Sequence, residues 1–246
     1  MEIVDVNCMI GRQEMRQHFT RPDQCLQTMD AYRITSAVAA HADARWNASR
    51  GNSAIRELAA QSEGRLQACY VLRPNLGGGE MPDGAALLAQ LREERPVAVR
   101  LFPQQDNFPL NSFFCGDLLE VLNEIRLPML IGYGDGKWCT ELPALAASFP
   151  DLPVVLLRVP IRQSGIILPL LAKTKTIYVD IGALIDNGLV EEVVRRHGSQ
   201  QLLFGSGMPF FLPAGSLGMV MYARIGEEAR TDILAGNWKR LQEERR

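Results

Sequence analysis

The stretch VAVRLFPQQDNFPLNSFFCGDLLEVLNEIRLPMLIGY, residues 97–133, contains one complete unit of the fold that we expect. It begins with an aliphatic segment, Val97–Phe102, continues through an amphipathic segment, Asp117–Ile125, and ends with a second apolar segment, Met129–Tyr133. Apolar residues recur in the middle segment at three- and four-residue spacing, which is typical of a helix. A helix between two short apolar runs predicts parallel strands joined by a crossover connection.

The same alternation continues in both directions along the chain. Another amphipathic segment, Asp83–Glu94, precedes the quoted stretch, and Pro96, Pro128 and Pro153 stand just before strands, where a missing N–H does least harm. A length of 246 residues is close to the usual size of an eight-stranded barrel. We therefore predict an α/β protein with one (β/α)8 barrel domain, residues 1–246. Its strands are Ile3–Met9, Thr35–His41, Leu66–Leu72, Val97–Phe102, Met129–Tyr133, Val154–Arg158, Thr176–Ile181 and Leu202–Ser206.

Composition and charge exclude several classes of protein. The formal net charge is -2, and acidic and basic residues are mixed along the chain, so there is no basic stripe for a nucleic-acid partner. No apolar run approaches the length of a membrane span, and the N-terminus begins like a strand, so we expect a cytoplasmic protein without a membrane partner. The five cysteines include no C-x-x-C pair, which predicts reduced thiols. The sequence leaves a homo-oligomer open.

In such barrels the functional site lies at the C-terminal ends of the strands, an end that we call the mouth. Because side chains alternate along a strand, Asp5, Asn7 and Met9 are expected to share one face, as are Arg100 and Phe102. The predicted strand ends carry the polar residues Asn7, His41, Arg100, Tyr133, Arg158 and Asp180.

Segments at both ends of the chain resemble the amidohydrolase-related family of barrels. The stretch Ile3–Gly11 is similar to the family's first strand, in which a His-x-His pair follows the aspartate and supplies two metal ligands. The stretch Leu202–Phe210 is similar to the final strand, in which an aspartate stands between the serine and the residue before proline, and Glu227–Leu241 resembles the closing helices. The segments Pro128–Gly132 and Pro153–Arg158 match strands that would each carry a ligand histidine. The resemblance covers nearly the whole chain and implies a hydrolase fold.

The chain departs from the family at every matched metal-ligand position. A zinc site needs imidazole, thiolate or carboxylate donors, and this chain does not supply them there. We therefore predict that the protein holds no metal and no other cofactor. The residues at the five positions are Asn7 and Met9 for the histidine pair, Gly132 and Arg158 on the next two strands, and Gly207 for the aspartate.

The arginines among these residues suggest an anion site. If Arg100 and Arg158 both face the mouth, they can bind the carboxylate or phosphate of a small anionic molecule through forked hydrogen bonds. Arg158 would be the main contact, buried and within hydrogen-bond reach of Asp5, Asp180 or the anion, and would replace the charge of the metal. The alternative is that Arg100, Arg158, Asp5 and Asp180 form an ion-pair network without any catalytic activity.

Other residues complete the predicted pocket. Asn7 and Tyr133 lie at strand ends and are predicted to bind substrate, and Trp46 lies on the loop that follows the second strand. That loop can form a lid or wall of the pocket, or it can be an exposed connection. Cys8 with His41 would make a nucleophile and base, but the alternation that turns Asn7 inward turns Cys8 toward the helices, as a buried thiol.

Two hypotheses about function follow from these residues. In the first, the protein is a metal-independent hydrolase or lyase, with His41 or Asp180 as the acid–base group and the arginines as the electrophilic element. In the second, it is a non-catalytic binding or scaffold protein that keeps the barrel and an anion pocket.

Overall fold

The eight strands pair side by side in chain order and form one parallel sheet, which confirms the predicted barrel. The computed structural model describes residues 1–12, 21–74, 82, 84–132 and 141–246. Its sheet order is β1 to β8, and each strand is parallel to the next. The strands are β1 (Val4–Ile10), β2 (Ser36–His41), β3 (Leu66–Val71), β4 (Ala98–Leu101), β5 (Met129–Gly132), β6 (Val154–Leu157), β7 (Ile177–Asp180) and β8 (Leu202–Leu203).

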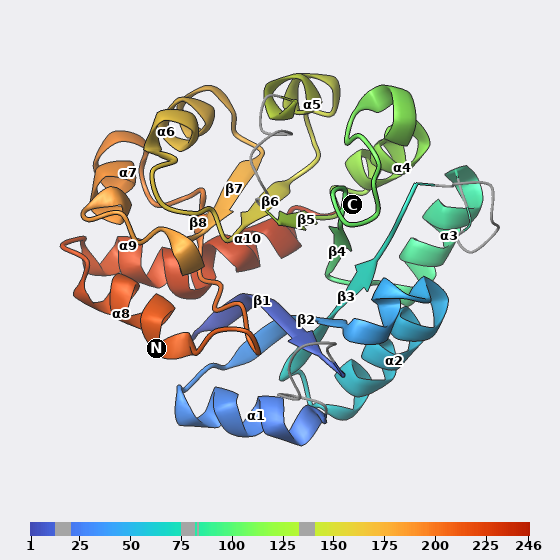
Figure 1. The fold of residues 1–246 in the computed structure, drawn as a ribbon, viewed down its shortest axis with the longest axis horizontal. Helices are drawn as coiled ribbons and strands as arrows, with labels where there is room; N and C mark the ends of the chain where they lie inside the picture. Colours follow the sequence, from blue (N-terminus) through green and yellow to red (C-terminus); the bar gives the residue numbers. More distant parts are fainter. Residues whose placement is uncertain (13–20, 75–81, 83, 133–140) are drawn as a thin grey trace.

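Helices follow the strands and surround the sheet on its outside (Figure 1). They are α1 (Pro22–Ala31), α2 (Ala48–Gln61), α3 (Gly84–Glu94), α4 (Ser112–Glu124), α5 (Leu142–Ser148), α6 (Ser164–Lys173), α7 (Leu189–His197), α8 (Pro213–Tyr222), α9 (Glu227–Thr231) and α10 (Asn237–Glu243). The described residues also include the short helical segments η1 (Ala42–Arg45), η3 (Ile181–Ala183) and η4 (Asp232–Gly236). In the part of the chain that the structure describes, no helix is both long enough and apolar enough to cross a membrane.

Backbone hydrogen bonds between β1 and the segment after β8 close the ring. Val6 N donates to Phe204 O at 2.9 Å, and Met9 N donates to Met208 O at 3.0 Å. In the other direction, Gly207 N donates to Asn7 O at 3.0 Å. These bonds bring the first and last strands of the barrel together, and with them residues nearly 200 positions apart in the sequence.

Two apolar clusters pack on opposite sides of the sheet. The outer cluster joins strand residues such as Cys8 to helix residues such as Cys25 of α1, whose sulfur lies 3.6 Å from that of Cys8. The inner cluster fills the barrel with strand residues such as Val6, and Trp238 of α10 packs into it. Cys8 is therefore a buried thiol facing the helices, as predicted.

In contrast to the prediction from the sequence, the side chains of β1 do not alternate regularly between the two faces of the sheet. Val6 and Cys8 are two residues apart, yet Val6 packs inside the barrel and Cys8 packs outside it. The reason is an irregularity in the pairing of β1 with β2, whose register shifts between Asp5 and Cys8. An extra residue in one strand reverses the side-chain alternation beyond it. Asp5 and Asn7 consequently do not share one face in the way that the sequence predicted.

Local side-chain chemistry explains where other boundaries differ from the prediction. Helix α4 begins at Ser112, five residues before the predicted start, because Asn111 Oδ1 accepts hydrogen bonds from the backbone of Phe113 and Phe114. The last strand ends at Leu203 instead of Ser206, and Gly207 beyond it has a left-handed φ of 77°. Gly198 ends α7 with a positive φ of 83°, a conformation that glycine adopts readily.

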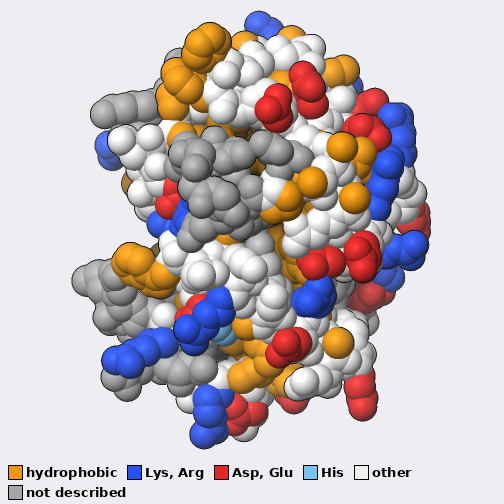
Figure 2. Space-filling model, turned by 90° about the vertical axis from the view of Figure 1, so that its right-hand side faces the viewer, with side chains coloured by type: hydrophobic (Ala, Val, Ile, Leu, Met, Phe, Trp, Pro, Cys, Tyr) orange, Lys and Arg blue, Asp and Glu red, His pale blue; other side chains and the backbone are white. Residues whose placement is uncertain are grey.

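Surface charge contributes less to the fold than these clusters. Acidic and basic side chains are mixed on the side of the molecule in Figure 2. Ion pairs such as Arg56–Glu94 and Arg92–Glu124 link the neighbouring helices α2, α3 and α4. Exposed pairs of this kind contribute about 0–1 kcal/mol each. The stability of the barrel therefore depends mainly on its apolar interior.

We expect Trp238 to be one of the most sensitive positions of the inner cluster. It is 2% exposed, and its Nε1 donates to Gln67 Oε1 at 3.0 Å. Trp238→Ala should lower the free energy of unfolding by roughly 3–5 kcal/mol, and Trp238→Phe by less, because most of the volume stays. Trp46 is 71% exposed, so Trp46→Ala should change the free energy of unfolding by less than about 0.5 kcal/mol. Urea unfolding of the three variants measures this, and equal losses at positions 238 and 46 would contradict the packing.

Candidate functional site

A buried carboxyl group holds the junction between β1 and the segment after β8. Asp5 has no exposed surface, and its Oδ1 accepts hydrogen bonds from Asn7 N at 3.0 Å and from Ser206 N at 2.9 Å. Its Oδ2 accepts a hydrogen bond from Ser206 Oγ. Burial raises the pKa of Asp5 to about 7, and the hydrogen bonds from Ser206 and Asn7 oppose that shift. Asp5 thus binds the backbone of the junction instead of the arginines that the sequence predicted as its partners.

Asn7 connects the ends of three strands. Its Nδ2 donates to Asp180 Oδ2 of β7 at 2.9 Å, and its Oδ1 accepts a hydrogen bond from Arg100 Nη1 of β4 at 3.3 Å. Asp180 Oδ1 also accepts from Gly182 N at 2.6 Å. Burial raises the pKa of Asp180 to about 6, while the hydrogen bonds from Asn7 and Gly182 lower it. Three of the predicted site residues therefore meet in one hydrogen-bonded chain.

Arg158 reaches the same region from the end of β6. It follows the strand with a left-handed φ of 54°, and its side chain is partly exposed. Its Nη1 donates long hydrogen bonds to Gly182 O at 3.3 Å and Ser206 O at 3.4 Å, and its Cζ lies 3.3 Å from the centre of the Phe211 ring. The side chain contacts the segments after β7 and β8, but it is partly exposed and not buried as predicted, and its hydrogen-bond acceptors are neutral carbonyl groups instead of carboxylates.

No carboxylate bonds directly to the Arg100 side chain among the residues that the structure describes. Its Nη1 contacts the neutral amide of Asn7, and its buried Nε has no hydrogen-bond partner within the same described ranges. Burial lowers the pKa of both Arg100 and Arg158. The charge of Asp180 opposes this shift in both arginines, but Asp180 makes no direct bond to either guanidinium. A guanidinium that is partly removed from water and has no directly bonded acid is stabilised by an anion.

Two further arginines at the mouth share a carboxylate. Asp106, in the loop after β4, pairs with Arg45 at 3.2 Å and with Arg73 at 3.1 Å. Arg45 Cζ also lies 4.0 Å from the centre of the Phe102 ring, and Arg100 Cζ lies 5.0 Å from the same ring. Phe102 therefore lies beside the guanidinium of Arg45, which is paired with Asp106, and beside that of Arg100, to which no carboxylate of the described residues bonds directly. Asp106 could not be identified from the sequence, because its loop carries no pattern that separates it from other acidic loop residues.

His41 and Trp46 lie at the end of β2 and are not part of this hydrogen-bonded chain. His41 Nδ1 accepts a hydrogen bond from Asp43 N at 3.2 Å, so neutral His41 carries its proton on Nε2. Burial lowers the pKa of His41, although the charge of Asp43 opposes this. Trp46 is 71% exposed, so its predicted binding role stays a prediction. The predicted ligand contact Tyr133 lies outside the described residues.

The residues at this site do not fit a transition metal. The matched positions hold an amide, a thioether, a guanidinium and two glycines, at Asn7, Met9, Arg158, Gly132 and Gly207. Asn7 already bonds Arg100 and Asp180, and the Arg158 side chain brings a positive charge to the same mouth. Within residues 1–12, 21–74, 82, 84–132 and 141–246, no three His, Cys, Asp or Glu side chains are grouped to hold a metal ion.

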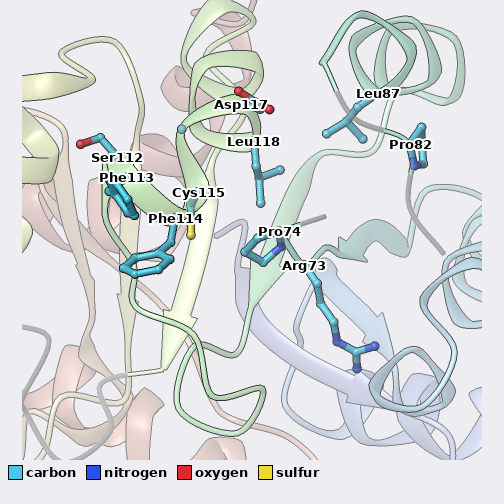
Figure 3. Close-up of a pocket in the computed structure, with 11 residues that line it drawn as sticks. Arg73, Pro74, Pro82, Leu87, Ser112, Phe113, Phe114, Cys115, Asp117 and Leu118 are labelled. Carbon is cyan, nitrogen blue, oxygen red and sulfur yellow. The ribbon is translucent and has the colours of Figure 1, made fainter. Parts of the chain in front are cut away.

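A cavity of about 150 Å³ lies beside this site, between the segment that follows β3 and the start of α4. Figure 3 shows Phe113 and Phe114 of α4 on one side of it and Pro82 and Leu87 on the other. Arg73, which also lines it, is the partner of Asp106. Among the described residues, those that line this cavity include none of the site residues predicted from the sequence. It is therefore separate from the group formed by Asn7, Arg100, Asp180 and Arg158.

Comparisons with known proteins agree with this barrel architecture. A family model described as Amidohydrolase matches residues 13–241, and no curated protein matches the chain. Among solved structures, an uncharacterised TIM-barrel protein from Bordetella bronchiseptica is similar, with a TM-score of 0.79 and 14% identity over 99% of both chains.

Two similar solved structures carry the names of enzymes. One is 5-carboxyvanillate decarboxylase from Sphingomonas paucimobilis, with a TM-score of 0.74 and 11% identity over 98% of this chain and 99% of that chain. The other is 4-oxalomesaconate hydratase from Rhodopseudomonas palustris, with a TM-score of 0.71 and 14% identity over 98% of this chain and 96% of that chain. At such identities the similarity establishes the fold alone.

The raised pKa of Asp5 predicts how stability depends on pH. Because the folded-state pKa is about 7 and the ordinary value is 3.8, folding favours the neutral form of Asp5. This contribution is fully present below pH 3.8 and is lost as the pH rises through 7, and Asp180 acts with the same sign up to about pH 6. Between pH 5 and pH 8 the wild type should lose roughly 2–3 kcal/mol more stability than Asp5→Asn, which cannot ionise.

Urea unfolding at the two pH values measures this difference. Asp117→Asn removes an exposed carboxylate on α4 and is the control for lost negative charge, so it should follow the wild type. If Asp5→Asn kept the wild-type pH dependence, Asp5 would be ionised in the folded protein at pH 5, and our account of the junction would be wrong.

Proposed function

We propose that this chain, which belongs to the amidohydrolase family, binds a small carboxylate or phosphate compound at its barrel mouth and acts on it without a metal. The reaction would be a hydrolysis or a lyase-type cleavage. The observation that supports the proposal is that no carboxylate bonds directly to the guanidinium of Arg100 or Arg158 within the described parts of the chain, although the charge of Asp180 acts on both. Other arginines at the mouth, Arg45 and Arg73, share Asp106.

The carboxyl groups nearby support an anionic ligand. Asp5 and Asp180 are the buried acids of the site, and burial shifts both of their pKa values toward neutrality, to about 7 and about 6. At neutral pH Asp180 is therefore mostly ionised and Asp5 only partly, and neither carboxyl group bonds directly to a guanidinium group of the described residues. An incoming carboxylate or phosphate would add negative charge and would accept hydrogen bonds from guanidinium groups, a geometry that Arg favours.

In the proposed reaction the arginines stabilise negative charge that develops on the substrate. Fixed donors in a site that excludes water do this without rearranging, and such groups commonly supply the largest part of a rate enhancement. Asn7 positions Arg100 through its Oδ1 and is itself held by Asp180. Neutral His41 would donate a hydrogen bond from Nε2, and Asp180, with a pKa of about 6, would hold or release a proton near neutral pH.

A second candidate function is binding without catalysis. Asp180 has no exposed surface, and both of its carboxylate oxygens already accept hydrogen bonds, from Asn7 and from Gly182. A group in this state orients its neighbours more readily than it exchanges protons with a substrate. The two candidates share the anion site and differ in turnover. The absence of nucleic-acid and membrane partners, a homo-oligomeric state and a cytoplasmic location stay predictions of the sequence.

Removing either guanidinium should abolish most of the anion affinity. Charged hydrogen bonds contribute about 1.5–3 kcal/mol each, so Arg158→Met and Arg100→Met should each weaken binding roughly 10- to 100-fold. Calorimetric titration with inorganic phosphate and with acetate at low ionic strength measures this. Arg162→Met, at an exposed arginine in the same loop as Arg158, is the matched control and should bind like the wild type. Equal binding by all three variants would refute the proposed site.

Metal content tests the other half of the proposal. The donor set at the mouth predicts that the purified protein holds no stoichiometric transition metal, and that a chelator changes neither its stability nor its anion affinity. Elemental analysis checks the first statement, and thermal unfolding with and without chelator checks the second. About one tightly held zinc ion per chain would contradict the proposal.

A further inference from the structure

The guanidinium of Arg158 lies in a space bordered by Gly207 and Phe211, two residues of the segment after β8. The ring of Phe211 stacks on it, with 3.3 Å between the ring centre and Arg158 Cζ. Gly207 borders the same space, because a Cβ atom there would lie 3.0 Å from Arg158 Nη1 and 3.1 Å from Phe211 Cδ2. Both distances are shorter than ordinary carbon contacts. A side chain at position 207 would therefore push either the guanidinium or the aromatic ring away.

We propose that Gly207 and Phe211 are positioning residues that form a seat for Arg158 and thereby set the preference of the mouth for anions. This inference rests on the proposed function and adds the residues that prepare the anion contact. The seat holds one face of the guanidinium against Phe211 and directs Nη1 to the carbonyl groups of Gly182 and Ser206. Among the described residues, Nε and Nη2 of Arg158 form no hydrogen bond, so that edge of the group can bind an oxygen acid.

Preorganisation is the physical reason for such a seat. A free arginine side chain loses rotamer freedom when it binds a ligand, and a side chain that is already fixed loses less. A stacked aromatic ring fixes the plane of the guanidinium and attracts its charge, and it leaves the edge of the group open. Phe211 is 48% exposed, so its apolar surface is not explained by burial in the core. Contact with Arg158 gives this exposed ring a function.

The seat is tested with two variants that disturb it by different means. Phe211→Leu removes the stack, and Phe211→Tyr keeps an aromatic ring and should behave like the wild type. Gly207→Ala adds the Cβ atom that crowds Arg158. Gly188→Ala is its matched control, because Gly188 has nearly the same φ, 75° against 77°, and an added Cβ there meets nothing within 4 Å. Phe113→Leu, at a ring that is 87% exposed, controls for the loss of an exposed aromatic side chain.

Two measurements are made on each variant. The first is the rate at which phenylglyoxal modifies Arg158 without any ligand, followed by peptide mass spectrometry. The second is the affinity for inorganic phosphate. For Phe211→Leu and Gly207→Ala we expect modification of Arg158 to be several times faster and phosphate binding about fivefold weaker, the size expected for one partly exposed cation–π contact. The variants Phe211→Tyr, Gly188→Ala and Phe113→Leu should match the wild type in both measurements.

The two readouts separate the seat from the proposed function. Unchanged modification of Arg158 in both Phe211→Leu and Gly207→Ala would overturn the seat, whatever happens to binding. Faster modification in these two variants, together with a wild type that binds no phosphate or acetate, would support the seat and overturn the anion site. Equal changes in Gly207→Ala and Gly188→Ala would show that backbone strain is responsible and would also overturn the inference.

Discussion

The buried carboxyl group of Asp5 is the contact on which the arrangement of the mouth depends. It accepts hydrogen bonds from the backbone of Asn7 in the first strand and from Ser206 after the last, so one side chain fixes both sides of the barrel's closing junction. Asn7 then reaches Asp180 and Arg100, and the turn at Gly207 meets Arg158. A displacement at the junction would move every residue of the proposed site.

Charge balance supports the proposal that this barrel works without the cation that the family resemblance implies. A barrel that loses a divalent ion but keeps ionised acids would hold uncompensated negative charge at a cost of several kcal/mol. Here burial raises the pKa of Asp5 and Asp180 toward neutrality, and Arg158 brings a permanent positive charge to the same region. Together these changes leave the mouth with an excess of positive charge. The natural complement is an anion.

Sequence patterns predicted the scaffold well and the contacts of the site only in part. The eight strands followed from alternating apolar and amphipathic segments, and the position of Arg158 at a strand end followed from the family resemblance. The contact of Asn7 with Arg100 could not be predicted, because it joins strands 93 residues apart and depends on the register shift in β1. Phe211 was missed for a related reason. It lies on an irregular segment after the last strand, where no periodicity indicates the direction of a side chain.

We propose that a ligand anion occupies the mouth in place of a metal. A crystal structure of the protein grown with phosphate and zinc would distinguish these two possibilities. Data collected on both sides of the zinc absorption edge distinguish the two species. Our account predicts phosphate density in contact with the guanidinium groups of Arg158 and Arg100, and no anomalous zinc signal beside Asn7, Met9 or Asp180. A zinc ion bound at those residues, or phosphate bound only elsewhere on the protein, would contradict it.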